Sequence, residues 1–268
     1  MIVDPPVIWA GILALAVFLY VVLDGFDLGL GILFPAYRDP EERSVMVNTV
    51  ASVWDWGFTA GSVLAAFSQG IEVDETARQF AGGAFDWLSP FSLLTGLSVV
   101  AGYALLGATW LVMKTEGPLR ALARRLAWPL AITVVGAVGA VSLATPFLEA
   151  GYMDRWFAVP HIYYSAAVPI LVGLTVPGLF HSRRIELHDD RPFLLTLMLY
   201  GLCFAGLGVS MWPSIVPPDI TIHEAAAPPK AQGFMLLGAG ILLPIILAYT
   251  AYAFWVFRGK VTEDSGYH

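Results

Sequence analysis

The chain has 268 residues, of which 57% are hydrophobic and 13% are charged, and its mean hydropathy is +0.71. This hydrophobic fraction exceeds the roughly 45–50% typical of soluble domains, so the composition excludes an ordinary soluble protein and predicts a multi-span membrane protein. Neither the formal net charge of -7 nor the single cysteine, Cys203, identifies a partner or a redox compartment, and no nucleic-acid partner is expected.

Long apolar segments follow one another along the whole chain. A bilayer core about 30 Å thick needs roughly 20 helical residues. Seven segments reach this length, at about residues 7–36, 44–72, 88–113, 123–148, 159–181, 192–216 and 232–257. The sequence therefore predicts an all-α, polytopic transmembrane helix bundle that forms one integral-membrane domain over residues 1–268.

The first segment contains two aspartates, Asp24 and Asp27, and no lysine or arginine that could neutralise them. An ionisable side chain at membrane depth costs roughly 3 kcal/mol or more and by default indicates a function. The three-residue spacing puts both carboxylates on one helix face, where each favours the protonated form of the other. We expect a proton path or an ion site here, extended by Tyr20 one turn earlier. A structural pair bonded to a neighbouring helix is the alternative.

The second segment carries a further acid, Asp55, between Trp54 and Trp56. Two interpretations stay open for this group. It is either an aromatic anchor at the membrane surface with Asp55 hydrogen-bonded there, or Asp55 joins the polar path of the first segment.

Small residues predict where helices approach each other closely. Gly25 and Gly29 form a Gly-x-x-x-Gly face beside the two aspartates. Similar close pairs later in the chain are Gly136 with Gly139, Gly206 with Gly208, and Gly238 with Gly240.

Basic residues gather after alternate segments. Of the 14 lysines and arginines, all but Arg78, Arg155 and Lys230 lie near the connections that follow the first, third, fifth and seventh segments. The positive-inside rule therefore predicts an N-terminus outside the cell and a C-terminus in the cytoplasm. In this orientation Asp24 and Asp27 lie toward the cytoplasmic half of their span.

The histidines argue against a haem ligated by this chain. A membrane cytochrome needs axial histidine or methionine ligands inside its helices. All five histidines lie at predicted span ends, in loops or at the terminus. The sequence therefore predicts a chain that ligates neither haem nor another metal by itself.

Several stretches resemble subunit II of the cytochrome bd-type quinol oxidases. They are residues 23–34 (LDGFDLGLGILF), 107–117 (GATWLVMKTEG), 212–226 (WPSIVPPDITIHEAA), 243–252 (LPIILAYTAY) and 255–261 (WVFRGKV). The resemblance covers nearly the whole chain in family order. It leaves open whether the chain belongs to the cyanide-insensitive branch.

The resemblance implies a location in the bacterial inner membrane and a role in a complex that oxidises quinol and reduces dioxygen to water. The expected partner is the larger subunit I, which holds all the haems, and the surrounding membrane lipid. Subunit II stabilises this partner, lines a proton route from the cytoplasm and in some members holds a structural quinone. A small third subunit occurs in some complexes. The family acid on the first helix matches Asp27.

The chain departs from the family in one place. Family members usually have nine spans, and a motif like Asn48–Ala51 is followed there by a WDGN motif and two helices before a WDWG segment. Here the sequence runs directly from residues 48–51 to residues 54–57 (WDWG). A helix pair, and the acid of its motif, is therefore expected to be missing. Asp55 is a candidate to replace that acid from a different helix.

Two other functions stay open from the residues alone. The chain could be an autonomous proton-coupled or ion-coupled transporter that uses Asp24 and Asp27, although no inverted repeat is evident. It could also be a non-functional remnant with an internal deletion. A natural short form, an incomplete gene product and a deleted chain would each give the same sequence.

Overall fold

A computed structural model describes residues 4–37, 53–70, 73–74, 79–80, 83, 85, 88–148, 150–182, 189–218 and 220–256. Within helices and strands, the side chains of residues 24, 26, 27, 53–57, 73–74, 79–80, 150 and 253–254 lie outside this description. The first part of the predicted second span, residues 44–52, also lies outside the described residues.

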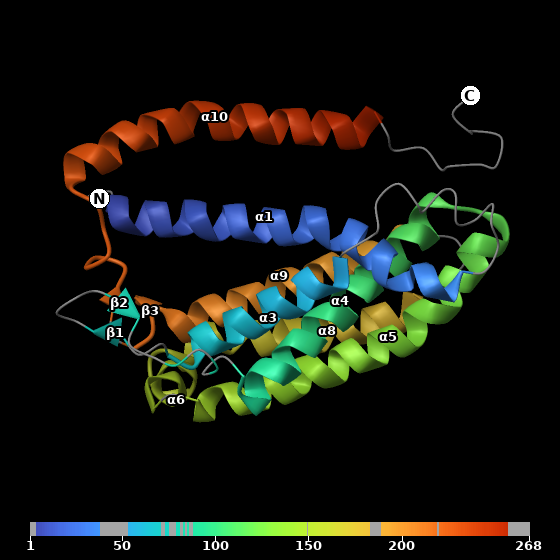
Figure 1. The fold of residues 1–268 in the computed structure, drawn as a ribbon, viewed down its shortest axis with the longest axis horizontal. Helices are drawn as coiled ribbons and strands as arrows, with labels where there is room; N and C mark the ends of the chain where they lie inside the picture. Colours follow the sequence, from blue (N-terminus) through green and yellow to red (C-terminus); the bar gives the residue numbers. More distant parts are fainter. Residues whose placement is uncertain are drawn as a thin grey trace.

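Apolar helices make up almost all of the described chain (Figure 1). The long ones are α1 (Pro5–Leu33), α3 (Val53–Ser68), α4 (Pro90–Lys114), α5 (Gly117–Ala144), α8 (Ala167–Ser182), α9 (Arg191–Met211) and α10 (Pro229–Val256). Short ones are η1 (Phe34–Ala36), η3 (Thr145–Phe147), α6 (Ala150–Phe157) and α7 (Ile162–Ser165). Two small antiparallel pairs join β1 (Val73–Asp74) to β2 (Gln79–Phe80), and β3 (Ser214–Val216) to β4 (Ile220–Thr221). The predicted all-α helix bundle is confirmed.

Six helices of the described part are long and apolar enough to cross a membrane. They are Pro5–Ala36, Pro90–Lys114, Gly117–Phe147, Ile162–Ser182, Arg191–Met211 and Pro229–Tyr252. The predicted segment 44–72 contains α3, which has 16 residues and an apolar part at Phe58–Ser68. The total of seven spans stays a prediction, because residues 38–52 lie outside the description.

Prolines set several helix boundaries. α4 begins at Pro90, after Ser89, whose hydroxyl accepts a hydrogen bond from the Ser92 N–H at 3.0 Å. A proline is tolerated at such a start because its missing N–H would have had no helical partner there. Between α7 and α8 the helix is interrupted at Ala166, since Pro169 cannot donate to the carbonyl of Ser165.

The predicted span 192–216 is too long at its C-terminal end. α9 ends at Met211, and Trp212 is in an extended conformation with ψ 136°. A residue that precedes a proline avoids the helical region, and Pro213 follows directly. Residues 214–216 form β3 instead of a further helical turn.

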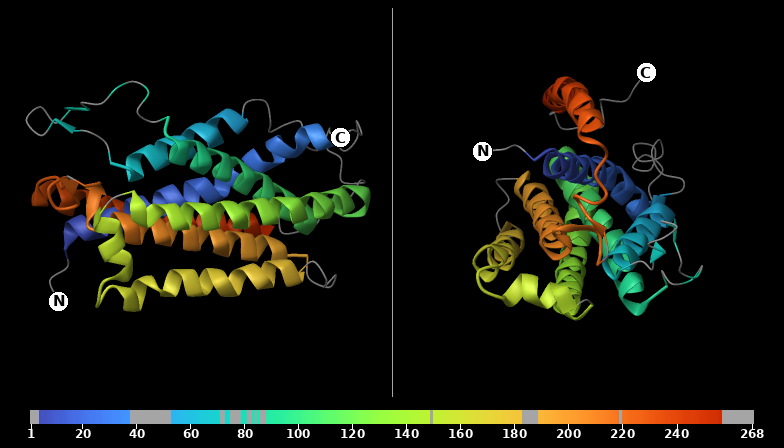
Figure 2. Two further views of the ribbon diagram at one scale, coloured as in Figure 1. Left: turned by 90° about the horizontal axis from the view of Figure 1, so that it is seen from below. Right: turned by 90° about the vertical axis from the view of Figure 1, so that its left-hand side faces the viewer.

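Successive long helices run in opposite directions (Figures 1 and 2). Helices α1, α4, α8 and α10 start at the end of the bundle that carries Asp4, named the Asp4 end. Helices α3, α5 and α9 start at the other end, named the Arg120 end. Lys114 and Arg191 also lie at the Arg120 end, as the charge pattern requires. Which end faces the cytoplasm stays a prediction.

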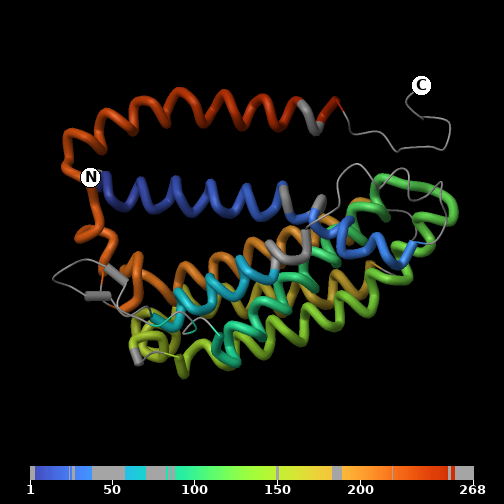
Figure 3. The backbone as a smooth tube through the Cα atoms, in the orientation of Figure 1, coloured from blue at the N-terminus to red at the C-terminus, as the bar shows by residue number. Residues whose placement is uncertain are grey.

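Helix α4 lies at the centre of the bundle, and α10 lies at its edge. Half of the apolar core stretch of α4 is buried, whereas none of that of α10 is. On one side α4 shares a buried cluster with α1 and α5; it also joins α5, α8 and α9 in a second cluster. Helix α10 runs beside α1, which it contacts near its start through the hydrogen bond from the Trp9 indole to the Gln232 carbonyl, and it stands apart from the other helices (Figure 3).

Close backbone contacts hold α1 and α3 against α4. A Cβ atom built on Gly29 would lie 1.9 Å from the carbonyl oxygen of Tyr103, and one built on Gly107 would lie 2.4 Å from the carbonyl carbon of Gly29. A Cβ atom on Gly61 would lie 2.9 Å from the Cα of Gly96. The close approach predicted at Gly25 and Gly29 is therefore confirmed, with α4 as the partner.

The other glycine pairs do not behave as predicted. A Cβ atom on Gly136, Gly139, Gly238 or Gly240 would meet nothing within 4 Å, and one on Gly206 would make only ordinary contacts, the nearest at 3.5 Å. The spacing of small residues permits close approach, but it does not supply a neighbouring helix.

We predict that Gly29→Ala weakens the fold, whereas Gly136→Ala leaves it unchanged. The new methyl group at residue 29 meets α4 backbone, which cannot rotate away, so the helices must separate at a cost of about 2 kcal/mol or more. The thermal stability of the purified protein in detergent, followed by size-exclusion chromatography, measures this difference. Equal midpoints for the two variants would contradict the observed crossing.

Candidate functional site

The candidate site lies at the α1–α4 crossing, because the two aspartates of α1 belong to the stretch of helix that contacts α4. Asp24 and Asp27 lie in α1, on either side of Gly25. A Cβ atom on Gly25 would lie 3.0 Å from Cδ1 and Cε1 of Tyr103, so the Tyr103 ring rests on this stretch of α1 backbone. Asp27 lies six residues before Leu33, roughly 9 Å along the axis from the end of α1. The acids are therefore nearer to the Arg120 end than to the Asp4 end.

The side chains of Asp24, Asp27 and Asp55 lie outside the described residues. Asp55 belongs to the first turn of α3, which packs against both α1 and α4. A polar path through all three acids thus stays a prediction. The Tyr20 side chain is 67% exposed.

Two tyrosines that the sequence reasoning missed lie beside this crossing. Tyr103 of α4 and Tyr200 of α9 stack with ring centroids 6.3 Å apart and planes at 8°. The hydroxyl of Tyr200 is buried and has no hydrogen-bond partner among the described residues. In a sequence, a tyrosine within an apolar helix cannot be distinguished from an ordinary packing residue. Only the tertiary structure identifies this pair.

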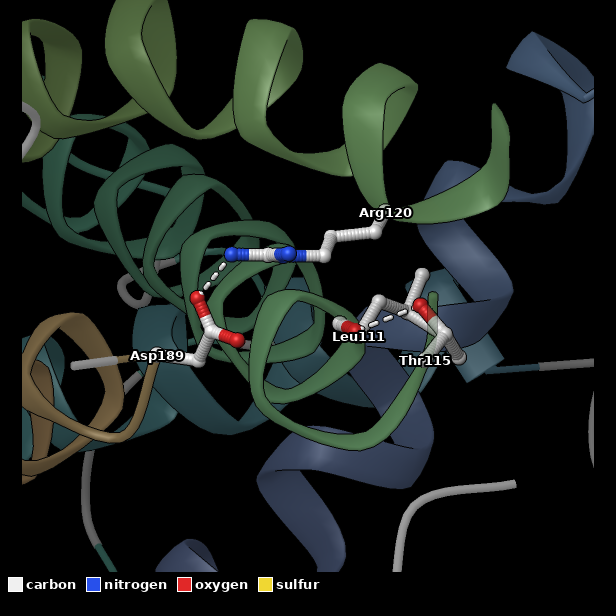
Figure 4. Close-up of polar contacts among 4 residues, drawn as sticks. All are labelled: Leu111, Thr115, Arg120 and Asp189. Atoms are coloured by element: carbon white, nitrogen blue, oxygen red, sulfur yellow. Dashed lines mark hydrogen bonds and ion pairs between the residues drawn. The ribbon is translucent and has the colours of Figure 1, made fainter. Parts of the chain in front are cut away.

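Charged groups close the bundle at the Arg120 end. Arg120, near the start of α5, donates a hydrogen bond to the carboxylate of Asp189, two residues before α9 (Figure 4). Both side chains are largely buried, with 27% and 15% exposure. Beside them, Thr115 follows the last residue of α4, and its hydroxyl donates a hydrogen bond to the Leu111 carbonyl at 2.6 Å (Figure 4). The Lys114 ammonium lies 5.1 Å from the centre of the Trp110 ring.

A small cavity of about 40 Å³ lies between α4, α5, α8 and α9. Its wall is mostly apolar, with Thr109, Ser182 and Arg124 as polar members. This volume suffices for a few water molecules and is far smaller than the pockets that hold organic ligands. The cavity therefore indicates no binding site for a cofactor by itself.

Polar contacts also tie elements together at the Asp4 end. Tyr152 of α6 donates to the Ser68 carbonyl at 2.6 Å, and Trp156 donates to the Ser210 hydroxyl at 2.9 Å. His223 and Asp4 lie 2.8 Å apart, which links the segment before α10 to the start of α1. These contacts are structural.

The segment between β4 and α10 contains one perturbed acid. Hydrogen bonds from the N–H and the hydroxyl of Thr221, each 2.8 Å long, lower the pKa of Glu224. Glu224 therefore stays ionised and does not serve as a proton carrier near neutral pH.

The sequence matches the profile of the family described as cytochrome bd terminal oxidase subunit II. The match covers residues 5–59 and, in a second segment, residues 50–257. The chain belongs to this family. This match confirms the predicted resemblance. It also confirms the predictions that the chain is a subunit of a quinol oxidase complex and that it is a multi-pass protein of the bacterial inner membrane.

Individual subunit II relatives are distant in sequence. Cytochrome bd-I ubiquinol oxidase subunit 2 of Escherichia coli (strain K12) is 24% identical over 361 aligned positions, which cover 96% of this chain and 95% of the relative. Cytochrome bd ubiquinol oxidase subunit 2 of Bacillus subtilis (strain 168) is 23% identical over 225 positions, covering 79% and 64%. A probable cytochrome oxidase subunit 2 of Haemophilus influenzae is 24% identical, covering 84% and 70%.

This subunit II is shorter than the E. coli relative by an internal stretch. The alignment extends over 361 positions, whereas the chain has 268 residues, so the relative has residues at many aligned positions where this chain has none. The family match is divided into two segments that meet at residues 50–59, where the sequence predicts the gap. That the gap corresponds to two helices stays a prediction.

We predict that Asp189→Asn destabilises the subunit by about 1–3 kcal/mol, because it leaves the largely buried Arg120 guanidinium without a counter-charge. The neighbouring change Asp190→Asn provides the control, since Asp190 is exposed and its side chain makes no capping hydrogen bond to α9. Thermal unfolding of the two purified variants measures the effect. A loss of stability for Asp190→Asn as large as that for Asp189→Asn would show that the ion pair is not responsible.

Proposed function

We propose that this chain is the haem-free second subunit of a bd-type quinol oxidase, that it stabilises the haem-bearing subunit I, and that it contributes a cytoplasmic proton path. The observation that carries the proposal is the family match over residues 5–59 and 50–257, which includes the acid-bearing helix α1. The complex would oxidise quinol and reduce dioxygen to water, and this chain would not catalyse either step alone.

The positions of the histidines support a haem-free chain. His161 directly precedes α7, His181 lies in the last turn of α8, and His223 lies between β4 and α10. None of the three lies in the middle of a long helix, where an axial ligand would be needed. Among the described residues, no three His, Cys, Asp or Glu side chains form a group that could hold a metal ion. The haems would lie in subunit I, and a quinone in this chain would be structural.

The proton path would begin at Asp24 and Asp27. Two acids on one turn of a span without basic residues are expensive to retain unless they exchange protons. If the Arg120 end faces the cytoplasm, Asp27 lies roughly 9 Å from the end of its helix and within reach of cytoplasmic water. It would accept a proton there and pass it toward the oxidase site. Asp55 of α3 would assist, and Tyr20 would extend the path toward the partner.

The stabilising role would use apolar surface that the bundle leaves uncovered. Along α10, large apolar side chains are exposed on several faces of the helix, among them Phe234, Leu237, Ile241, Leu242 and Ile246. Lipid or another subunit must cover these side chains in the membrane. Subunit I is the partner that family membership implies; a small third subunit would occupy what remains.

We expect co-expression with a haem-bearing subunit I to give a stable complex that shows haem absorption bands and consumes oxygen with quinol as donor. The chain purified alone should hold no stoichiometric haem. Absorption spectra and oxygen-electrode rates measure both. Haem in the isolated chain would contradict a haem-free subunit, whereas degradation without assembly would favour a non-functional remnant. Proton-coupled uptake by the chain alone in liposomes would favour a transporter.

We predict that Asp27→Asn lowers oxidase turnover in the assembled complex about tenfold or more, since a transferred proton would lose its carrier. Asp27→Glu should retain a larger share of the rate, because it keeps a titratable group. Asp154→Asn in α6, at the Asp4 end, serves as the control. Oxygen consumption and proton uptake are measured per haem. Wild-type rates for Asp27→Asn would exclude the proposed path.

A further inference from the structure

The stacked tyrosines Tyr103 and Tyr200 connect the acid-bearing helix α1 to α4 and α9. Tyr103 is 4% exposed, and its ring touches the α1 backbone at Gly25, between the two aspartates. On its other side it stacks on Tyr200 of α9. The two rings thus bridge three helices, α1, α4 and α9, in the middle of the membrane-spanning region.

The hydroxyl of Tyr200 packs directly against the α4 backbone at Gly102. A Cβ atom built on Gly102 would lie 2.3 Å from Oη of Tyr200, so only glycine at residue 102 leaves room for this oxygen against the α4 backbone. Yet Oη is buried and has no hydrogen-bond partner among the described residues. Burial of a hydroxyl without a partner costs about 1–3 kcal/mol. A phenylalanine would fill nearly the same space without this penalty, so packing alone does not explain the hydroxyl.

We propose that the hydroxyls of Tyr103 and Tyr200, together with water bound at Oη of Tyr200, continue the proton path from Asp24 and Asp27 across α4 to α9. The inference rests on the proposed function, because it extends the path that begins at these acids. It adds Tyr103 and Tyr200 to the proton path, and it predicts that the path runs sideways from α1 to α9 near the middle of the membrane.

Neutral tyrosine can perform this transfer without a redox step. A tyrosine hydroxyl both donates and accepts hydrogen bonds. Its oxygen accepts a proton from the neighbour on the α1 side while its own hydroxyl proton passes to the neighbour on the α9 side. One O–H bond forms as another breaks, no electron moves, and the side chain stays neutral. The contact between the two rings holds both side chains in place during the transfer.

Tyr200→Phe and Tyr103→Phe in the assembled oxidase test the proposal, with Tyr163→Phe as the matched control. Tyr163 lies on α7 and is 78% exposed. We expect each buried variant to lower turnover per haem about fivefold to tenfold, which is less than the roughly hundredfold or more that a general acid or base contributes. We also expect a larger solvent isotope effect in D₂O. The double variant should be no slower than the slower single one, because both groups serve one path. Tyr163→Phe should match the wild type.

The readouts separate this proposal from the proposed function. If Asp27→Asn is slow while Tyr200→Phe has the wild-type rate and isotope effect, the tyrosine relay is wrong and the acid path stands. If Tyr200→Phe is slow and Asp27→Asn is not, the tyrosines do not continue a path from Asp27, and the relay is overturned as well. Failure of Tyr200→Phe to assemble would also contradict the proposal, because removal of an unpartnered hydroxyl should not weaken the fold.

Discussion

The backbone contact between Gly29 and Gly107 determines where the acids of α1 lie. Because neither residue has a side chain, α1 and α4 approach so closely that even a methyl group at either position would overlap backbone atoms. The same contact places the Tyr103 ring against Gly25 and therefore beside Asp24 and Asp27. Helix α4 in turn packs on α3, α5 and α9. One glycine crossing thus relates the acid pair to the rest of the bundle.

Hydropathy and charge predicted much of this architecture. Apolar length located the helices, and the glycines beside Asp24 correctly predicted a close crossing, because both signals are local in the sequence. Gly136 and Gly139 look similar but face no neighbour, since spacing does not reveal which helix lies opposite. The Arg120–Asp189 pair joins residues far apart in the chain. Tyr200 was missed for the same reason: its stacking partner and the room at Gly102 exist only in the folded bundle. The end of α9 at Met211 could have been predicted from Pro213.

We expect the internal gap to change the surroundings of the α1 acids relative to longer relatives. In this chain α3 follows α1 and packs on both α1 and α4, with Gly61 against Gly96. The described helices therefore form a connected bundle across the gap. Asp55, on a helix that begins at the Arg120 end, stays the candidate to replace the acid that the resemblance assigns to the missing segment. The proposed proton path consequently depends on Asp24 and Asp27 more than it would in a longer member.

The most direct test of the central claim is an infrared difference spectrum of the assembled oxidase during reduction and reoxidation. If the α1 acids carry protons, a protonated-carboxyl band should change during turnover, shift in D₂O and disappear in Asp27→Asn. The same band should remain in Asp154→Asn. A spectrum in which Asp27→Asn removes no carboxyl signal, in a complex that still turns over, would contradict the claim that this helix handles protons.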